Sequence, residues 1–456
     1  MNYDLSRFLL FFCLGCCLSC TDEGVIDDEE EVIDSTVKTE INKWVFDRMK
    51  NYYLWYDELP AENTLQYEQE PKTFFNSLLT DKDGKNGSHY SRIEYDDSIL
   101  RSSKKDVSYG FEYRLIRIAD KNEFLAQALY VFKDSPADKA GLKRGELIIT
   151  VDGKALTASN YSDLLDTPKS GAEMQLGKMV SETHFDKSRT IQMGRPEEAE
   201  DNSVYLDTVI PIQNHKIAYL VYNSFEDEYD DNLRMAFRKF KEAEADEFVL
   251  DLRYNRGGSI SSSQLLATML VPEAYMGKEF IHLKYNKLIN RQYNLLFDKS
   301  VIGRGANINP QRLYIITSES TASASEAIIN GLRPYMNSNL IQVGETTFGK
   351  NVGQALFTNE KWQSLEVWPT SFNLFNSEDF GDYEKGLPAD VEYSEGLQLG
   401  EFASKEDPLF SIVLSIIEGK DLSKNSLRSS NKNFEIIYNS LSRKQPLGYY
   451  KKDAVS

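Results

Sequence analysis

The sequence predicts a mixed α/β protein with a helical N-terminal domain, a smaller β-rich domain and an α/β core. The core is predicted from strand and helix patterns that alternate from about residue 205 onward. The N-terminal domain is predicted from apolar residues at helical spacing between 35 and 56. The middle domain is predicted from short β-type segments between turn residues over 106–198. A chain of 456 residues is long enough for roughly two to four such domains.

The first 20 residues have the features of an export signal. Arg7 precedes an apolar run over 8–18, and the small Ser19 precedes Cys20. The ending Leu18-Ser19-Cys20 resembles a bacterial lipobox, in which the cysteine is lipidated and becomes the first residue of the mature protein. We expect a signal peptide over 1–19 and a lipid anchor at Cys20, with an ordinary signal peptide as the alternative.

An acidic segment follows Cys20. Residues 20–34 are rich in Asp and Glu, and this composition is typical of a disordered tether. Acidic residues directly after the lipidated cysteine are similar to the surface-export signals of some Gram-negative lipoproteins. We therefore expect a lipoprotein of the bacterial cell envelope, on the periplasmic face or the outer surface of the outer membrane. The membrane contact is expected to be through the anchor only.

The composition excludes several classes of function. The chain has 71 Asp and Glu residues against 52 Lys and Arg, and this net charge of −19 argues against binding nucleic acid. All four cysteines lie within the first 20 residues. The folded body therefore contains no disulfide, no zinc–thiolate site and no cysteine nucleophile. We expect neither a metal nor another cofactor.

Residues 35–105 are predicted to form the helical N-terminal domain. A helix is expected over 35–56 and ends before Pro60, and a second is expected near 71–79. The first helix and the residues after it are rich in aromatic side chains. These side chains are more typical of a packed core or a domain interface than of a ligand-binding box.

Residues 106–198 contain a run that resembles the signature of bacterial PDZ domains. In this run Pro136 begins a short helix, Gly141 ends it, and Asp152-Gly153 forms a hairpin turn. A PDZ domain binds an extended peptide along a sheet edge and holds its terminal carboxylate with backbone amides. The matching peptide-binding loop is Tyr109-Gly110-Phe111, which lies just before a predicted strand at 112–116.

Residues 199–395 are predicted to form the α/β core, with a functional site at the carboxyl ends of its strands. The expected strands are 217–221, 248–252 and 312–317, and the expected helices are 230–243, 261–270 and 325–332. Residues 396–456 are expected to form a C-terminal helical extension. It would contain one helix at 407–418 and a polar, frayed end.

Ser323 lies in the segment 319–326, between a buried strand and a helix. A serine at such a turn is held close to the first amides of the helix, and those amides and the helix dipole can stabilise an oxyanion. Taken alone, this pattern is more often a simple N-cap.

The segment 344–351 has two interpretations. It nearly fits a phosphate-binding loop, but Asn351 stands where that motif needs Ser or Thr, and no helix pattern follows. If the segment is not a phosphate-binding loop, Lys350 can have another role. A buried lysine can act as a base, because burial disfavours its charged form.

Three segments, in this order and behind a PDZ-like domain, resemble the motifs of the carboxyl-terminal processing protease family. They are 250–258, 321–326 and 344–354, and 386–391 is similar to a further strand motif of that family. The resemblance covers roughly 106–395. It implies a crotonase- or Clp-protease-like α/β serine protease core that uses a Ser–Lys dyad.

The resemblance also implies a role for each site residue. Ser323 is the nucleophile, Lys350 is the base, and Gln354 orients the lysine. The oxyanion hole is formed by the amide of Ala324 and the amide of Gly257 or Gly258.

Two other serines compete with Ser323 for the role of nucleophile, Ser325 and Ser320. The separation of 25 positions between Ser325 and Lys350 fits the family better than the separation of 27 between Ser323 and Lys350. Choosing Ser323 requires two extra residues in the irregular stretch 333–342.

The sequence therefore predicts a serine endopeptidase. It would cleave extended or C-terminal polypeptide segments, assisted by its PDZ domain, and its partners would be polypeptide substrates. The alternative is a catalytically inactive, lipid-anchored PDZ protein that only binds peptides. The presence of Ser323, Lys350 and Gln354 favours the enzyme.

Overall fold

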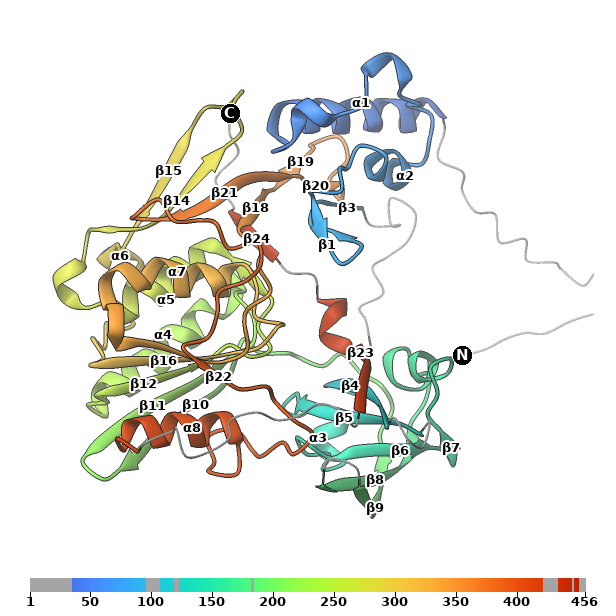
Figure 1. The fold of residues 1–456 in the computed structure, drawn as a ribbon. Coiled ribbons are helices and arrows are strands. Elements are labelled where there is room, and N and C mark those ends of the chain that lie inside the picture. Colours follow the sequence, from blue (N-terminus) through green and yellow to red (C-terminus); the bar gives the residue numbers. More distant parts are fainter. Residues whose placement is uncertain are drawn as a thin grey trace, which may run out of the picture.

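The computed structural model describes residues 35–95, 107–118, 123–181, 184–420, 434–444 and 447–450 (Figure 1). The predicted signal peptide, the acidic tether and Cys20 lie outside these residues. Within the described ranges, no helix is both long and apolar enough to cross a membrane.

The N-terminal domain contains the two predicted helices and, in addition, three short strands. Its elements are α1 (Ser35–Tyr52), η1 (Tyr56–Glu58), η2 (Glu62–Thr64), α2 (Pro71–Asn76), β1 (Gly84–Lys85), β2 (Ser88–His89) and β3 (Arg92–Glu94). Strand β3 pairs with β20 (Glu366–Trp368), which in turn pairs with β19 (Phe357–Thr358). The domain is therefore joined to the core by a small shared sheet. The aromatic-rich stretch packs as predicted, with Tyr53 buried and the Tyr52 ring tilted against the Phe357 ring at 4.4 Å between centres.

The PDZ-like domain is a twisted antiparallel sheet with two short helical segments. Its elements are β4 (Phe111–Ile118), β5 (Glu123–Val131), α3 (Pro136–Lys139), β6 (Leu147–Val151), β7 (Lys154–Ala155), η3 (Ser162–Asp166), β8 (Ala172–Ser181) and β9 (His184–Met193). Two predictions are confirmed here: a helix begins at Pro136, and a tight turn at Asp152-Gly153 joins β6 to β7. Both turn residues have positive φ, as a two-residue hairpin turn requires.

Two six-stranded sheets and three main helices form the core. The first sheet has the order β10-β11-β12-β16-β17-β22, and the second has the order β13-β24-β18-β21-β14-β15. The first sheet contains β10 (Val204–Ile212), β11 (His215–Tyr222), β12 (Glu247–Asp251), β16 (Arg312–Thr317), β17 (Leu340–Gly344) and β22 (Val391–Glu392). The second contains β13 (Gly257–Ser259), β14 (Glu279–Tyr285), β15 (Gln292–Leu296), β18 (Val352–Ala355), β21 (Thr370–Asn376) and β24 (Leu447–Tyr450). The helical segments are η4 (Asp227–Tyr229), α4 (Asp230–Glu242), α5 (Ile260–Leu270), η5 (Glu273–Tyr275), α6 (Lys299–Ile302), α7 (Ala324–Met336) and η6 (Asn337–Asn339).

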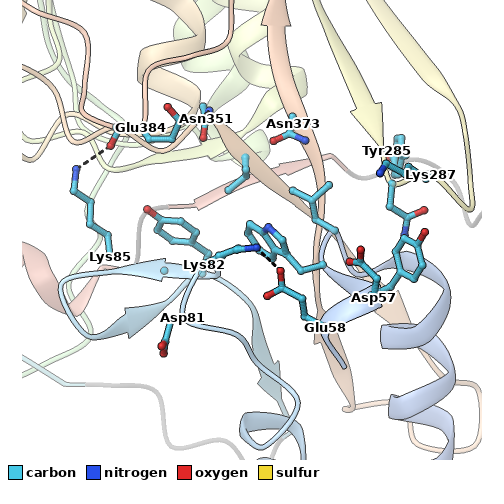
Figure 2. Close-up of a pocket in the computed structure, with 18 residues that line it drawn as sticks. Asp57, Glu58, Asp81, Lys82, Lys85, Tyr285, Lys287, Asn351, Asn373 and Glu384 are labelled. Atoms are coloured by element: carbon cyan, nitrogen blue, oxygen red, sulfur yellow. Dashed lines mark hydrogen bonds and ion pairs between the residues drawn. The ribbon is translucent and has the colours of Figure 1, made fainter. Parts of the chain in front are cut away.

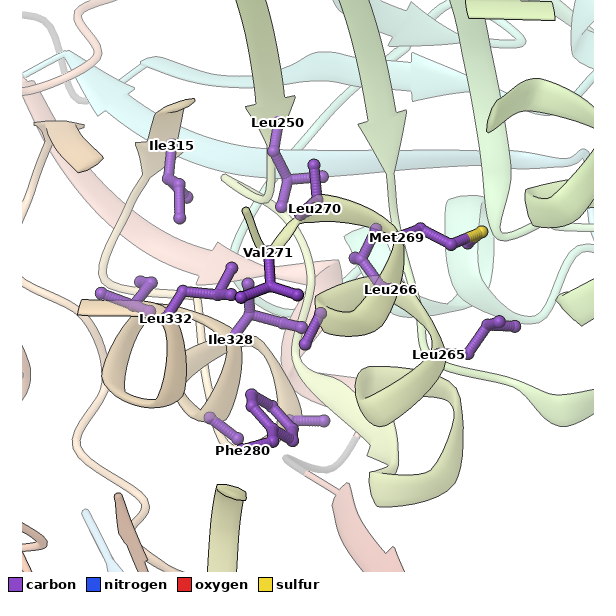
Figure 3. Packing of buried hydrophobic residues seen from close by; sticks show 14 of the residues in the cluster. Leu250, Leu265, Leu266, Met269, Leu270, Val271, Phe280, Ile315, Ile328 and Leu332 are labelled. Atoms are coloured by element: carbon purple, nitrogen blue, oxygen red, sulfur yellow. The ribbon is translucent and has the colours of Figure 1, made fainter. Parts of the chain in front are cut away.

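Helices α5 and α7 pack against each other and against the first sheet. Figure 3 shows Leu266, Ile328 and Leu332 of the two helices in one buried cluster with Leu250 and Ile315 of the central strands. All five side chains are almost completely inaccessible to solvent. Burying a side chain of this size contributes about 1.5–3 kcal/mol. This packing fixes the first turn of α7 relative to the ends of β12 and β16.

The prediction of a frayed C-terminal end is wrong for the described residues. Helix α8 (Pro408–Ile417) forms as expected, and the short helical turn η9 (Ser440–Arg443) follows later in the chain. However, β23 (Phe434–Asn439) pairs with β4 of the PDZ-like domain, and β24 lies within the second core sheet. Both strands are short, with six residues in β23 and four in β24. Their pairing depends on exposed edges far away in the sequence, which a local pattern does not reveal.

A buried ionic cluster holds the PDZ-like domain against the core. Arg253 forms ion pairs with Asp251 at 2.7 Å, with Glu395 at 2.6 Å and with Asp407 at 2.8 Å. Arg144 of the PDZ-like domain reaches the same Glu395 carboxylate at 2.6 Å. Burial alone would raise the pKa of Glu395, but the neighbouring arginines lower it to about 2. The motif residues Asp251 and Arg253 therefore have a structural role.

We expect Arg253→Ala to destabilise the protein by about 3–5 kcal/mol, because it leaves three buried carboxylates without their shared cation. Urea unfolding followed by circular dichroism measures this change. The control is Arg238→Ala, which removes a largely exposed pair with Glu242 and should cost less than about 1 kcal/mol. Equal losses for the two variants would contradict a structural role for the cluster.

Candidate active site

Ser323 lies directly before α7 in a conformation that is unusual for a residue with a side chain. Its φ is 58° and its ψ is −109°, and it is 1 % exposed. Strained backbone of this kind concentrates at functional sites. The Oγ atom has no hydrogen-bond partner among the residues that the structure describes. The hydroxyl is thus held at a helix N-terminus without a structural hydrogen bond there.

The competing serines have different surroundings. The Ser325 hydroxyl is buried and donates to the carbonyl oxygen of Asn255 at 3.2 Å. Ser320 is partly exposed and lies in the loop before the turn. The stretch 333–342 was expected to be irregular, but most of it is regular: it contains the end of α7, the short turn η6 and the start of β17. These surroundings favour Ser323 over Ser325.

Glu326 connects the serine segment to the lysine segment. Its carboxylate accepts the backbone N–H of Ser323 at 2.7 Å, of Gly349 at 2.6 Å and of Lys350 at 2.8 Å. The Thr347 hydroxyl donates to it at 2.5 Å. Glu326 is the last residue of the serine motif at 321–326, but its role was not predicted. Glu326 is fully buried, and a buried carboxylate needs such hydrogen bonds. The only signal in the sequence was an acidic residue among the small residues of 321–326.

Lys350 is completely buried beside a glutamine and an aromatic ring. Its Nζ donates to Gln354 Oε1 at 3.1 Å and lies 4.9 Å from the centre of the Tyr90 ring. The Gln354 amide nitrogen donates to the Tyr90 carbonyl oxygen at 2.9 Å, so the N-terminal domain fixes the orientation of Gln354. Burial and the nearby Arg92 lower the pKa of Lys350 well below its usual value. The segment is followed by β18 and not by a helix, which excludes the phosphate-loop interpretation.

The two candidate oxyanion glycines differ in their hydrogen bonding. The Gly257 amide donates to Asn255 Oδ1 at 2.8 Å, so it is already used. Gly258 has a φ of 141°, and a Cβ there would lie only 2.1 Å from the Phe225 carbonyl oxygen. Only glycine fits this position. The Gly257 amide is thus committed to Asn255, and the backbone at Gly258 passes close to the Phe225 carbonyl oxygen.

A pocket of about 710 Å³ separates the N-terminal domain from the lysine segment (Figure 2). Gly349, Asn351 and Val352 line one side of it. Across it, Lys85 of β1 donates to the carbonyl oxygens of Phe348 and Glu384, the latter at 3.2 Å. The N-terminal domain therefore contacts the backbone of the segment that carries Lys350.

The predicted peptide-binding loop lies at the end of a second groove, of about 900 Å³. Tyr109, Gly110 and Phe111 line it, together with residues of the helical segment η3. Gly110 has a φ of 79°, and a Cβ there would lie 2.3 Å from the Ser135 Cβ. The loop thus lines the groove and has a tight backbone at Gly110. Its role in peptide binding stays a prediction.

The fold and this arrangement of residues define a PDZ-containing α/β protein of the serine hydrolase type. Family models match three parts of the chain: the peptidase S41 N-terminal domain over 40–92, a PDZ domain over 129–172 and peptidase family S41 over 216–392. A crystal structure of a Bacteroides fragilis protein assigned to the S41 proteases is 31 % identical, with a TM-score of 0.73. That match covers 82 % of this chain and 97 % of the other. The chain belongs to peptidase family S41.

Curated relatives carry the name of carboxyl-terminal processing proteases. CtpB of Bacillus subtilis is 25 % identical over 49 % of this chain and 43 % of its own length. The protease of Picosynechococcus is 26 % identical over 49 % of this chain and 50 % of its own length. The chain thus aligns with about half the length of these relatives. The resemblance to this protease family is confirmed, and so is the mixed α/β fold with a PDZ domain.

Proposed function

We propose that the protein is a serine endopeptidase that cleaves extended or C-terminal polypeptide segments with a Ser323–Lys350 dyad. The observation that carries this proposal is the shared Glu326 carboxylate, which binds the backbone N–H of both residues. One carboxylate thereby fixes the serine turn and the lysine segment relative to each other. The lowered pKa of Lys350 supports its role as a neutral base.

In this mechanism neutral Lys350 takes the proton of the Ser323 hydroxyl as Oγ attacks the scissile carbonyl carbon. The amides of Ala324 and Gly258 stabilise the negative oxygen that forms. Lys350 then donates its proton to the leaving amine, and the peptide bond breaks to give an acyl-enzyme. Water, activated by the same lysine, hydrolyses the ester and restores Ser323. Gln354 positions the lysine through its hydrogen bond to Nζ.

The test is the steady-state hydrolysis of an unfolded polypeptide, such as fluorescein-labelled casein, by the protein and by its Ser323→Ala variant. Turnover by the protein and none by the variant is expected. The competing function is a catalytically inactive protein that binds peptides through Tyr109, Gly110 and Phe111. Equal, background-level rates for both forms over several substrates, together with peptide binding, would establish that function instead.

We also propose that Cys20 is the site of a lipid anchor and that the protein is a lipoprotein of the cell envelope. The support is the export-signal pattern and the ending Leu18-Ser19-Cys20. On this proposal the peptidase acts on polypeptides at a membrane surface.

We expect Glu326→Gln to lower kcat by roughly 10²-fold, because the amide group replaces one of the oxygens that fix the two segments. Glu326 acts here as a positioning residue. Its negative charge also raises the pKa of Lys350, so the variant should shift the acid side of the pH–rate profile to lower pH. The control is Glu319→Gln, an exposed carboxylate in the same segment. A purely structural role for Glu326 would reduce stability without moving the pH profile.

A further inference from the structure

The C-terminal part of the chain contacts both the PDZ groove beside Gly110 and the candidate catalytic residues at Ser323. We call residues 434–444 and 447–450 the C-terminal tail. Its strand β23 pairs antiparallel with β4, with Phe434 opposite Ile118 and Asn439 opposite Arg114. Strand β4 begins at Phe111, directly after the turn at Gly110. Antiparallel addition to this edge, running toward that loop, is how a PDZ domain binds a peptide.

The side chains of the tail also lie where a PDZ ligand would lie. The Tyr438 ring packs 5.9 Å from the Tyr113 ring of β4 and 4.8 Å from the Tyr161 ring, which precedes η3. Tyr438 thus lies between the strand and the helical segment and covers part of the groove. The tail residues Tyr438, Arg443 and Lys444 line the same 900 Å³ groove as Gly110.

Acidic residues of the groove bind the basic residues of the tail. Arg443 pairs with Asp166 at 2.9 Å and with Glu112 at 3.2 Å. Lys444 pairs with Asp201 and lies 3.6 Å from Glu112. The Glu112 side chain is only 4 % exposed. A buried carboxylate needs a cation, so the groove selects a basic segment.

The end of the tail lies across the candidate catalytic residues. Strand β24 runs parallel to β13 and β18 and separates them, with Gly448 opposite Gly258 and Tyr449 opposite Gln354. Figure 1 shows β24, in red, beside β18. A Cβ on Gly448 would lie 2.1 Å from Ser323 Oγ. The Tyr449 ring packs edge-on against Trp368, with 5.3 Å between the ring centres.

Strands β13 and β18 carry two of the groups that the mechanism uses, Gly258 and Gln354. Without β24 they would be separated by the width of one strand, since the sheet order is β13-β24-β18. An extended peptide can fill such a gap with backbone hydrogen bonds, whatever its sequence. The tail therefore occupies the place that the proposed mechanism requires for a substrate.

We propose that the C-terminal tail is a tethered inhibitor that occupies the PDZ groove and the catalytic cleft of its own chain. The proposal rests on the proposed function. The two sites form one path for a polypeptide, with an aromatic residue and then basic residues in the PDZ groove and a small residue at Ser323. A ligand that belongs to the same chain has a high effective concentration, on the order of millimolar. A substrate must displace it.

The test compares initial rates of casein hydrolysis by the full chain and by Gly448→Val, whose side chain would meet Ser323 and displace β24. Tyr438→Ala is a second variant, which removes the ring from the PDZ groove without touching the cleft. Both variants should be at least about fivefold faster than the unmodified protein, as release of a tethered competitor predicts. The control is Ile436→Ala on the same strand, because Ile436 is 46 % exposed. Rates of both variants at or below that of the unmodified protein would overturn the proposal.

A binding experiment separates this proposal from the proposed function. A fluorescent synthetic peptide of residues 434–450 is titrated into chains that carry Ser323→Ala, with and without Tyr438→Ala, which displaces the tail without depending on the Ser323 hydroxyl. Tight binding only when the tail is displaced supports the tethered inhibitor even if no form hydrolyses casein. Equal binding with and without displacement overturns it. Activity that depends on Ser323 but not on the tail would support the peptidase proposal and contradict the tethered inhibitor.

Discussion

Ser323→Ala is expected to lower kcat/KM by at least about 10³-fold, because the variant lacks the only atom that can form the acyl-enzyme. The substitution removes one buried oxygen that has no hydrogen-bond partner among the described residues, so the fold should be kept. Hydrolysis of labelled casein measures the rate, and thermal unfolding checks the fold. The expected result is full loss of turnover with an unchanged unfolding temperature.

The matched control for this variant is Ser325→Ala, two residues further along the same helix turn. The Ser325 hydroxyl is already bonded to the Asn255 carbonyl oxygen, so its loss should cost about 0.5–1.5 kcal/mol of stability. Activity should stay within a few-fold of the unmodified protein. If Ser325→Ala is inactive and Ser323→Ala is active, the choice of nucleophile is wrong.

The core could be predicted because its strands carry a strong local signal. Strand β16 is a run of apolar residues and has the bounds predicted for it, 312–317. Buried parallel strands are continuous hydrophobic segments in the sequence, and β16 is followed by helix α7. Ser323 follows β16, so its position at the carboxyl edge of the sheet could be predicted from chain order. Strand β17, which precedes Lys350, was not among the predicted strands.

The surroundings of the lysine could not be predicted, since they come from distant parts of the chain. Gln354 is held by the carbonyl oxygen of Tyr90, which is 264 residues away in the sequence. Strand β3, which brings Arg92 close to the site, has only three residues. A segment this short shows no periodicity. The same limit explains why β24 was taken for part of a frayed end.

Lys350 should give the protein a rate that rises with pH. Only the neutral amine can accept the Ser323 proton, so activity is lost as pH falls through the lysine pKa. Burial lowers that pKa well below the usual value for lysine, so the acid side of the profile lies below the ordinary range of a lysine. Lys350→Ala should lower kcat by roughly 10²–10⁴-fold. The profile of kcat/KM against pH gives the pKa of the essential base in the free enzyme.

Arg92→Gln then tests whether this base is Lys350. Arg92 lies over the Trp368 ring, with 4.1 Å between the guanidinium carbon and the ring centre, and its positive charge helps to lower the lysine pKa. Without it the pKa of Lys350 rises, so the acid side of the profile should move to higher pH. The control is Lys82→Gln, which removes an exposed cation of the same domain that pairs with Glu58. A profile that moves equally with both variants, or with neither, would mean that another group is the base. A shift of the acid side of the profile with Arg92→Gln alone would instead indicate that the base is the buried Lys350. The N-terminal domain would then help to set the pKa of that base.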